Sequence, residues 1–318
     1  MYLNTASVLD LPSVDIDYGK ALCCELWQKA QRAFPGQTGS SVRLDQSGGD
    51  HFVLIVDEAR AFRFPHPGGH GPDLEIKVLR ALRRHAEIAT PDYDIIDPDG
   101  QFASYLLIAG VPLTPRRFFG LSADNVRIAI ADAVGLLKAL HALNPRAVEP
   151  AGVWPRMWSA GQFADRLRDT RLPALASRAP ELLPSIEDFL WRYRTDRAPR
   201  DVVLHGDLVS DHLLVDESTG RLTGIIDFGD VALGDPAHDL LGFWAYGEHA
   251  AVQAVAEYDQ FDADPTLLVR SRNHFVRYRI DRLVEMIVDG APAEPIREHA
   301  ALVAQLLTEP SYTNLRRR

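Results

Sequence analysis

The stretch VVLHGDLVSDHLLVDESTGRLTGIIDFGD, from Val202 to Asp230, combines apolar runs suited to burial with a cluster of acidic and histidine residues. We predict that HLLVD and RLTGIID form two strands joined by a turn at 217–220, because each is short, apolar and bounded by turn-forming residues. In such a hairpin His212 begins the first strand and Asp227 ends the second. Both side chains are therefore expected at the same open end.

Asp207 lies on the loop that enters this hairpin, five residues before His212. A carboxylate beside a second carboxylate and an imidazole is the combination that a divalent cation with a neighbouring general base requires. Each residue alone has an ordinary explanation, since a histidine at a strand start is often structural and an aspartate after a strand often caps a turn. The combined spacing of H-G-D, apolar strand, turn, apolar strand and D-F-G favours the chemical interpretation.

The bulk composition is that of a globular protein. Of 318 residues, 46% are hydrophobic and 25% are charged, which allows a core in one large or two modest domains. The formal net charge of -10 argues against a nucleic-acid partner and is compatible with cationic ligands. No apolar run approaches the roughly 20 residues of a membrane helix, and the first residues lack the regions of a signal peptide. We expect a cytoplasmic protein without a membrane partner, and a monomer.

The order of the predicted elements, β-rich first and helical later, indicates an α+β fold. Three short strands are expected within 41–65, with turns at 47–50 and 57–59, and a further strand is expected over 101–110. Helices are expected over 18–34, 72–85, 125–143, 161–172, 181–193, 239–258, 273–289 and 294–307.

Glu75 shares a predicted helix face with Val78, Leu79 and Leu82, so its carboxylate is expected to be half-buried and to need a cation. The chain has 34 basic side chains, of which only four are lysines. Anion binding in the first hundred residues is therefore expected to rely on arginine, which forms bidentate contacts and keeps its charge when buried.

Three motifs together resemble those of a known enzyme family. The H-G-D of 205–207, the D-F-G of 227–229 and the G-D-P-x-x-D-L of 234–240 are similar to the catalytic loop, the metal-binding loop and the following signature of the aminoglycoside phosphotransferase family. Within the last motif, Asp235 and Asp239 are expected to cap and brace the following helix.

The resemblance extends from Val42 to at least Tyr246. It implies a bilobal, protein-kinase-like α+β fold with a small antiparallel sheet in one lobe and mostly helices in the other. The nucleotide-binding lobe would comprise 1–109, and the helical lobe with the catalytic and metal-binding loops and the acceptor site would comprise 110–318.

The resemblance also implies a role for each matching position. Asp207 would accept or orient the proton of the acceptor hydroxyl, and Asp227 would hold a Mg²⁺ ion that bridges the nucleotide phosphates. His205 would be a structural member of the loop. His212 stands where the family usually has asparagine, and an altered metal response is expected because Mg²⁺ prefers oxygen ligands. Histidine here is similar to some 2''-aminoglycoside and macrolide phosphotransferases, so it does not indicate inactivation.

For the nucleotide, the kinase-like pattern requires a basic residue on the third strand paired with a helical glutamate. Arg63 in place of the usual lysine would pair with Glu75, although a simple packing ion pair is the alternative. The turn with Ser47, Gly48 and Gly49 would lie over the phosphates. Backbone groups of the segment that includes Leu106 and Ile108 would read the purine. Both ATP and GTP are compatible donors.

Acceptor recognition is expected in acidic and aromatic side chains of the helical lobe. The candidates are Asp211, Glu248, Tyr278, Asp281 and Glu285. A pocket lined by carboxylates would suit an aminoglycoside antibiotic, whose ammonium groups need acidic partners, and phosphorylation of one hydroxyl would confer resistance. The alternative is a solvated helix face with salt bridges to Arg277 and Arg282.

Three other functions stay open. A macrolide 2'-phosphotransferase is supported by His212 and by aromatic residues suited to a large apolar ring, namely Trp154, Trp158, Phe243, Trp244 and Tyr246. A kinase of a sugar or an amino alcohol is compatible with the same motifs. A catalytically silent nucleotide-binding module is the non-enzymatic alternative, in which His212 and Arg63 would mark decay.

Overall fold

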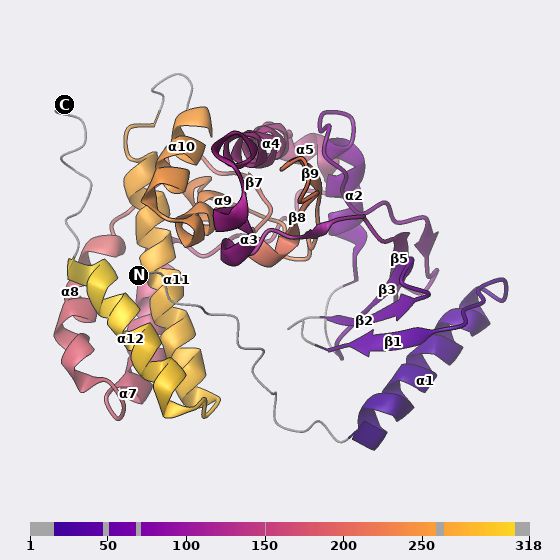
Figure 1. Cartoon of the computed structure of the whole chain (residues 1–318), viewed down its shortest axis with the longest axis horizontal. Helices are drawn as coiled ribbons and strands as arrows, with labels where there is room; N and C mark the ends of the chain where they lie inside the picture. The colour runs from indigo at the N-terminus through magenta and orange to yellow at the C-terminus, as the bar shows by residue number, and fades with distance from the viewer. Residues whose placement is uncertain (1–15, 47–50, 68–70, 150, 259–263, 309–318) are drawn as a thin grey trace. The chain divides into compact units, whose positions relative to one another are not determined.

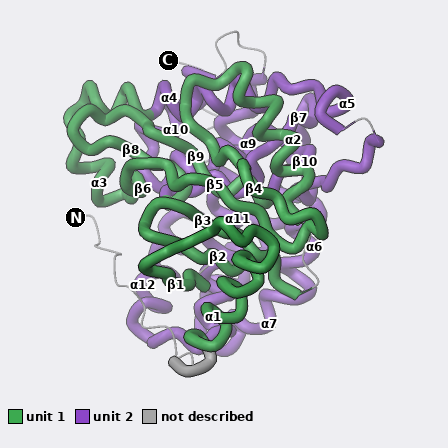
Figure 2. Tube along the Cα trace, turned by 90° about the vertical axis from the view of Figure 1, so that its right-hand side faces the viewer, with its two compact units in different colours: residues 1–129, 211–229 green, residues 130–210, 230–318 purple. Residues whose placement is uncertain are grey.

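The computed structural model describes residues 16–46, 51–67, 71–149, 151–258 and 264–308. The chain forms two compact units, coloured separately in Figure 2. Unit 1 comprises 1–129 and 211–229, and unit 2 comprises 130–210 and 230–318. His212 and Asp227 thus belong to unit 1, whereas Asp207 belongs to unit 2. The expected lobe boundary after residue 109 stays a prediction.

A five-stranded antiparallel sheet, with the order β1-β2-β3-β5-β4, forms the first part of unit 1 (Figure 1). Its strands are β1 (Val42–Asp45), β2 (His51–Val56), β3 (Arg60–Pro65), β4 (Ile95–Ile96) and β5 (Ala103–Leu106). The three strands expected within 41–65 are confirmed. Asp57 and Glu58 form the turn between β2 and β3 with φ of 51° and 48°, in the left-handed region that tight hairpin turns require. The turn expected at 47–50 lies outside the described residues.

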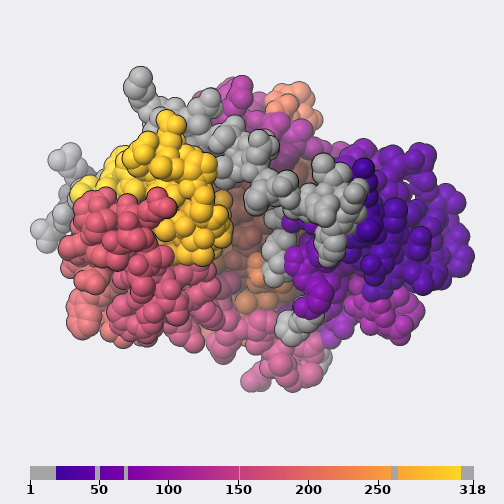
Figure 3. Space-filling model, turned by 90° about the horizontal axis from the view of Figure 1, so that it is seen from below, coloured from indigo at the N-terminus to yellow at the C-terminus, as the bar shows by residue number. Residues whose placement is uncertain are grey.

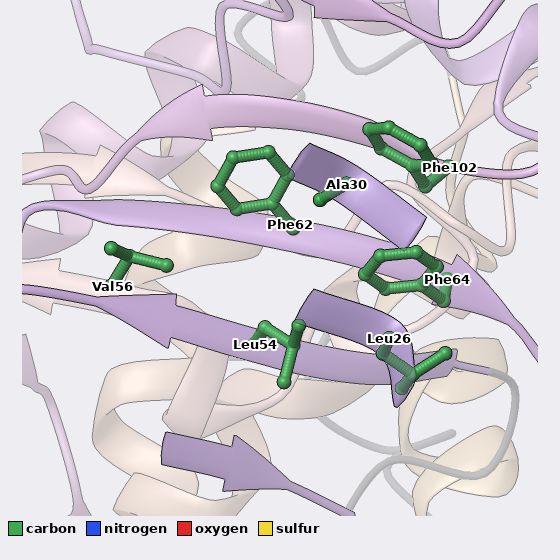
Figure 4. Close-up of a cluster of buried hydrophobic side chains, with 7 residues drawn as sticks. All are labelled: Leu26, Ala30, Leu54, Val56, Phe62, Phe64 and Phe102. Carbon is green, nitrogen blue, oxygen red and sulfur yellow. The ribbon is translucent and has the colours of Figure 1, made fainter. Parts of the chain in front are cut away.

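The helix α1 (Ile16–Ala33) packs against β1 and β2 and covers one face of this sheet. Figure 4 shows the buried side chains between them, which are Leu26, Ala30, Leu54, Val56, Phe62, Phe64 and Phe102. Each large side chain buried here stabilises the fold by roughly 1.5–3 kcal/mol. Because neighbours along a strand point to opposite faces, Phe62 and Phe64 in this core direct Arg63 to the other face.

The rest of unit 1 holds the helix that carries Glu75 and the hairpin next to His212 and Asp227. Its elements are α2 (Asp73–Leu82), α3 (Pro115–Gly120) and a three-stranded sheet of β6 (Val111–Pro112), β8 (Leu213–Val215) and β9 (Leu222–Ile225), in the order β6-β8-β9. The predicted hairpin is confirmed, because Leu213 pairs with Ile225. The strand expected over 101–110 is shorter in the structure, where β5 spans Ala103–Leu106, and Gly110 beyond it has a φ of 128° that a regular strand does not allow.

Unit 2 is mostly helical, and α4 (Ala123–His141) leads into it from unit 1. Its other helices are α5 (Pro145–Val148), α6 (Ala160–Arg166), α7 (Leu172–Leu175), α8 (Leu183–Tyr193), α9 (Ala237–Leu240), α10 (Glu248–Tyr258), α11 (Leu267–Val288) and α12 (Ala293–Thr308). Its short 3₁₀ segments are η2 (Pro180–Leu182) and η4 (Leu241–Tyr246), while η3 (Ser210–His212) begins at the last residue before the 211–229 segment of unit 1. Its strands are β7 (Val202–Leu204) and β10 (Ala232–Gly234), which pair with each other. Figure 3 shows the yellow surface of α12 beside the pink surface of α8, against which it packs.

The single helix predicted over 161–172 is wrong in its second half. α6 is followed by one turn of π-helix, η1 (Leu167–Arg171), before α7 begins. Pro173 explains the change, because proline cannot donate the backbone hydrogen bond that would continue an α-helix and its ring crowds the preceding turn.

The single helix predicted over 239–258 is also wrong, since α9, η4 and α10 share this segment. At Gly242 a Cβ atom would lie only 2.1 Å from the carbonyl oxygen of Leu208, so the chain is pressed against the backbone beside it. Gly247 has a φ of 92°, which ends η4 and allows α10 to begin at Glu248.

Within the described residues, no helix combines the length and the apolar character needed to cross a membrane.

Candidate active site

Arg63 is the centre of a buried charge cluster in unit 1. Its side chain is 7% exposed, and Nη1 donates to Oε1 of Glu75 at 2.8 Å while Nη2 donates to Oδ1 of Asp227 at 2.7 Å. The hydroxyl of Tyr93 accepts from Arg63 Nη1 at 3.1 Å and donates to Glu75 at 2.9 Å. The predicted Arg63–Glu75 pair is thus present, and one guanidinium links the helix α2, the strand β3 and the D-F-G segment.

Electrostatics keep this cluster charged. Burial raises the pKa of the Glu75 carboxyl, and the positive charge of Arg63 offsets part of that rise. Burial is the largest single influence on Arg63 and disfavours its charged form, but the electrostatic contributions of Glu75, Tyr93 and Asp227 together outweigh it and hold the pKa of Arg63 well above its usual range. Such a pair is costly to break, because the partner left behind would be a buried, uncompensated charge.

The open end of the hairpin carries His212 and Asp227, as predicted. Nε2 of His212 lies 3.4 Å from Oδ2 of Asp227, and the backbone N–H of Ile226 donates to the carbonyl of His212 at 3.0 Å. Asp227 has a φ of 65°, an uncommon conformation for a residue with a side chain, and residues held in this way are frequent at functional sites.

The donor set of this pair limits the metal site that it can form. Among the residues of the described ranges, no group of three or more histidine, cysteine, aspartate or glutamate side chains is arranged to hold a metal ion. Mg²⁺ in kinase-like sites is commonly bound by one or two protein ligands, with nucleotide phosphates and water completing the shell. Asp227 and His212 fit such a site with two protein ligands.

In unit 2, Asp239 of α9 anchors the loop that carries Asp207. The Asp239 carboxylate is fully buried and accepts the backbone N–H groups of His205 at 2.8 Å and of Gly206 at 3.0 Å. Nε2 of His141 lies 2.9 Å from the same carboxylate. Burial raises the pKa of Asp239, but the hydrogen bonds and the nearby histidines together have the larger effect, so its pKa is lowered.

Close contacts hold Gly206 in a fixed conformation. It has a φ of 89°, and a Cβ atom at this position would lie 2.1 Å from the carbonyl oxygen of Asp230. Its own carbonyl accepts a hydrogen bond from Nε2 of His238 at 3.0 Å. The Nδ1 atom of His205, a buried residue, accepts from the N–H of Asp207 at 3.3 Å. The backbone that leads into Asp207 is therefore held in place by several contacts.

The predicted nucleotide contacts are only partly described. Ser47, Gly48 and Gly49 lie outside the described residues. Leu106 is 60% exposed at the end of β5, whereas Ile108 packs against β9, where a Cβ atom on Gly224 would lie 2.5 Å from its side chain. The N–H of Leu107 donates to Ala59 at 2.8 Å, so this amide of the segment is already used within the sheet.

The structure brings together three of the predicted acceptor residues on α11. Asp281 accepts from Nη1 of Arg277 at 3.1 Å and lies 3.9 Å from Nε of Arg171. Glu285 lies 3.8 Å from Nη2 of Arg171 and 3.4 Å from Nη1 of Arg282. The salt bridges that were the alternative interpretation are thus present.

Tyr278, the third of these residues, is influenced electrostatically by Asp207 of the H-G-D loop. Burial raises the pKa of its hydroxyl, and the negative charge of Asp207 raises it further. The other two candidates lie on other elements: Asp211 is exposed in η3, and Glu248 is exposed at the start of α10.

Residues 39–268 match the model of the phosphotransferase enzyme family. The chain belongs to this family. The match covers the three motifs, Arg63 and Glu75, and it confirms the expectation of a phosphotransferase-family enzyme.

Among curated proteins, this phosphotransferase-family chain is 28% identical over 171 residues to the viomycin phosphotransferase of Streptomyces vinaceus, covering 48% of the chain and 54% of the relative. It is also 36% identical over 59 residues to the uncharacterized protein YcbJ of Bacillus subtilis, covering 18% and 19%. The chain therefore spans about half or less of the length of these relatives.

Solved phosphotransferase structures share the fold. The GDP and kanamycin complex of APH(2'')-IIIa superposes with a TM-score of 0.73 at 24% identity, covering 89% of this chain and 98% of the other. The macrolide 2'-phosphotransferase MphH from Brachybacterium faecium gives 0.57 at 22% identity, covering 90% and 98%. These likenesses confirm the predicted α+β, kinase-like fold.

Several supporting residues of this phosphotransferase-family chain were not predicted from the sequence. They are Tyr93, His141, His238 and the anchoring role of Asp239 for the loop. Asp239 was expected to brace a helix, but its carboxylate holds the loop backbone 33 and 34 residues earlier. The signal that could have indicated this is the hydrophobic surroundings of Asp239, because a carboxylate next to Leu240 and Leu241 needs buried donors.

Proposed function

We propose that this protein transfers the γ-phosphate of ATP or GTP to a hydroxyl group of an aminoglycoside antibiotic, which would confer resistance. The observation that carries this proposal is the bridge from Arg63 to both Glu75 and Asp227, because it links the helix carboxylate to the D-F-G aspartate. A phosphoryl-transfer site of this kind works mostly by positioning and charge neutralisation, and a rigid charged hub suits that task.

In the proposed reaction Asp207 accepts or orients the proton of the acceptor hydroxyl. The hydrogen bonds from the amides of His205 and Gly206 to Asp239 support this role, because they restrain the backbone that leads into Asp207. Asp227 and His212 would hold Mg²⁺, which when bound neutralises charge on the nucleotide phosphates. The nucleotide-containing structures that share the fold, with GDP or ADP, support a nucleotide donor.

A macrolide acceptor is the second candidate, and the arginines around α11 favour it. Asp281 and Glu285 are already neutralised by Arg171, Arg277 and Arg282, which leaves little negative charge for a polycationic acceptor. Macrolides present a single amino sugar on an apolar ring. Of the aromatic residues named for this alternative, however, Phe243, Trp244 and Tyr246 are buried, while Trp158 is 41% exposed.

The deciding experiment is the release of nucleoside diphosphate with Mg²⁺, separately with ATP and GTP, across kanamycin, gentamicin, streptomycin, viomycin and erythromycin. We expect stimulation by aminoglycosides and a fall in turnover of about 10²-fold or more for Asp207→Asn, with nucleotide binding retained. Asp188→Asn, an exposed i,i+4 partner of Arg192 in unit 2, is the matched control.

Each alternative has its own result in this experiment. Stimulation by erythromycin alone would replace the aminoglycoside with a macrolide acceptor. Nucleotide binding without turnover on any acceptor would support the silent module. Wild-type turnover by Asp207→Asn would contradict the role of Asp207.

A further inference from the structure

The Nη–H donors of Arg63 are already used by the protein. A guanidinium has four Nη–H donors and no acceptor. Nη1 donates to Glu75 and Tyr93, and Nη2 donates to Asp227 at 2.7 Å and contacts Nδ1 of His51 at 3.3 Å. A phosphate oxygen could therefore take an Nη–H of Arg63 only by sharing or displacing one of these bonds.

The contact with Arg63 decides the tautomer of His51. Since the guanidinium can only donate, Nδ1 of His51 must be the acceptor. The proton of the neutral ring then resides on Nε2, which becomes a hydrogen-bond donor. In kinase-like sites the basic residue of the third strand commonly binds phosphate. Here that residue, Arg63, instead fixes the tautomer in which His51 on the neighbouring strand carries a donor at Nε2.

The position of His51 follows from the strand register. His51 pairs with Pro65, and Val53 pairs with Arg63, so His51 and Arg63 lie on the same face of the sheet, diagonal to each other. This is the face opposite to the phenylalanines of the α1 core. The side chain of His51 is therefore on the side of the sheet that holds Asp227.

Gly229 of the D-F-G segment lies close to these groups. A Cβ atom at Gly229 would lie 3.2 Å from Nη2 of Arg63, 3.5 Å from Oδ1 of Asp227 and 3.8 Å from Cε1 of His51. Cε1 is the ring atom between the two nitrogens, so the nitrogen-bearing edge of His51 borders the D-F-G segment. A side chain at position 229 would crowd Arg63 and Asp227 at this edge of the ring, and glycine avoids that contact.

We propose that His51 is a phosphate-binding residue, whose Nε2–H donates to a phosphate oxygen of the bound nucleoside triphosphate while Arg63 holds its ring in place. This inference rests on the proposed function, because it assumes a nucleotide whose phosphates lie next to Asp227. Arg63 then serves as the hub that positions Glu75, Asp227 and His51, and His51 makes the direct contact.

Two substitutions separate direct phosphate binding from a purely structural role. His51→Gln keeps a donor near the position of Nε2 and loses the acceptor near Nδ1, whereas His51→Asn keeps a group near Nδ1 and loses the donor. His51→Ala removes both. His85→Gln is the matched control, because His85 is an exposed histidine of unit 1 beyond the end of α2.

The measurement is the dissociation constant of each variant for ATP and GTP with Mg²⁺, and for adenosine and guanosine, by calorimetry. We expect His51→Ala and His51→Asn to weaken triphosphate binding about tenfold or more, with nucleoside binding unchanged, since a hydrogen bond to a charged group is lost. His51→Gln should stay within about threefold of the wild type.

The opposite ranking, with His51→Asn like the wild type and His51→Gln like His51→Ala, would show that His51 only orients Arg63 and would overturn the proposal. Equal triphosphate affinities for His51→Gln, His51→Asn and His51→Ala would overturn it as well. Failure of the wild type to bind either nucleotide would instead refute the proposed function itself.

Discussion

Arg63 donates a 2.7 Å hydrogen bond to the carboxylate of Asp227, although 164 residues separate them in the chain. Arg63 is 7% exposed while Asp227 is 43% exposed, so the pair joins a buried cation to a carboxylate that solvent and ligands can reach. Any cation that binds Asp227 therefore meets a carboxylate whose orientation is already set. The strand β3 and the D-F-G segment are coupled through this contact.

Replacement of Arg63 should destabilise the protein in a graded way. Arg63→Met leaves Glu75 buried without its cation and should lower the free energy of unfolding by about 3–5 kcal/mol. Arg63→Lys keeps the charge but has a single nitrogen for four partners, and should cost about 1–3 kcal/mol. Urea unfolding measures both values.

Arg60→Lys is the control for this series. Arg60 lies on the same strand and also binds an aspartate through two nitrogens, but its partner Asp94 is 48% exposed. Its replacement should cost about 1 kcal/mol or less. Equal losses for Arg60→Lys and Arg63→Lys would contradict the view that Arg63 is a buried hub.

Gly206 should tolerate no side chain. Gly206→Ala places a Cβ atom where the carbonyl of Asp230 lies, and it also imposes a positive φ on alanine. Gly152→Ala imposes the second effect alone, because Gly152 has a φ of 77° and nothing within 4 Å of its Cβ position. We expect a loss of about 1 kcal/mol for Gly152→Ala and about 1–3 kcal/mol more for Gly206→Ala.

Turnover should distinguish these two alanine variants even more clearly than unfolding. Displacement of the loop at Gly206 moves Asp207, so kcat should fall on the order of 10²-fold, as expected when a catalytic group is misplaced by about 1 Å. The kcat of Gly152→Ala should equal that of the wild type. A fully active Gly206→Ala enzyme would mean that the position of this loop does not limit the reaction.

His212 should alter the choice of metal. An imidazole ligand favours Mn²⁺ over Mg²⁺ more than an amide oxygen does. We expect the ratio of kcat with Mn²⁺ to kcat with Mg²⁺ to be greater in the wild type than in His212→Asn, by on the order of threefold. Steady-state assays at saturating metal provide the ratio, and identical ratios would argue against His212 as a ligand.

His238 should make the protein less stable in acid. Burial, together with the positive charges of His274 and Arg277, lowers its pKa to about 3. The unfolded chain binds a proton at this histidine from about pH 6.5 downward, whereas the folded protein does not, so stability falls as the pH is lowered from about 6.5 toward 3. The slope contributed by one such group is at most about 1.4 kcal/mol per pH unit.

The variant His238→Gln keeps a donor for the carbonyl of Gly206 but does not titrate, so its free energy of unfolding should fall less between pH 7 and pH 5. His299, whose pKa burial also lowers, to about 4, should account for part of the slope that is left. Parallel slopes for the wild type and His238→Gln in chemical unfolding would exclude His238 as the source.

Local patterns made much of the site predictable. The alternation of strand residues and the turn at 217–220 placed His212 and Asp227 together, and the helical spacing around Glu75 indicated its need for a cation. Both depend on neighbours within a few residues, or on one hairpin. A periodic pattern reports such relationships directly.

Contacts between distant segments were not predictable in this way. The bonds from Asp239 to the loop of His205 and the close approach of Gly206 to Asp230 depend on how separate segments meet, which periodicity does not describe. The aromatic residues of η4 looked available for a ligand because a 3₁₀ segment and an amphipathic helix are alike in sequence.

The interleaved composition of unit 1 has a consequence for synthesis on the ribosome. The strands β8 and β9 complete its second sheet, and Ala89 pairs with Gly224 of β9, yet residues 211–229 are translated only after the whole of 130–210. In the nascent chain, β6 therefore lacks its neighbour β8 while residues 130–210 of unit 2 emerge. Chains that stop before the hairpin would present an incomplete sheet to the cell's proteases, so the hairpin that carries His212 and Asp227 also makes folding of unit 1 depend on synthesis of most of the chain.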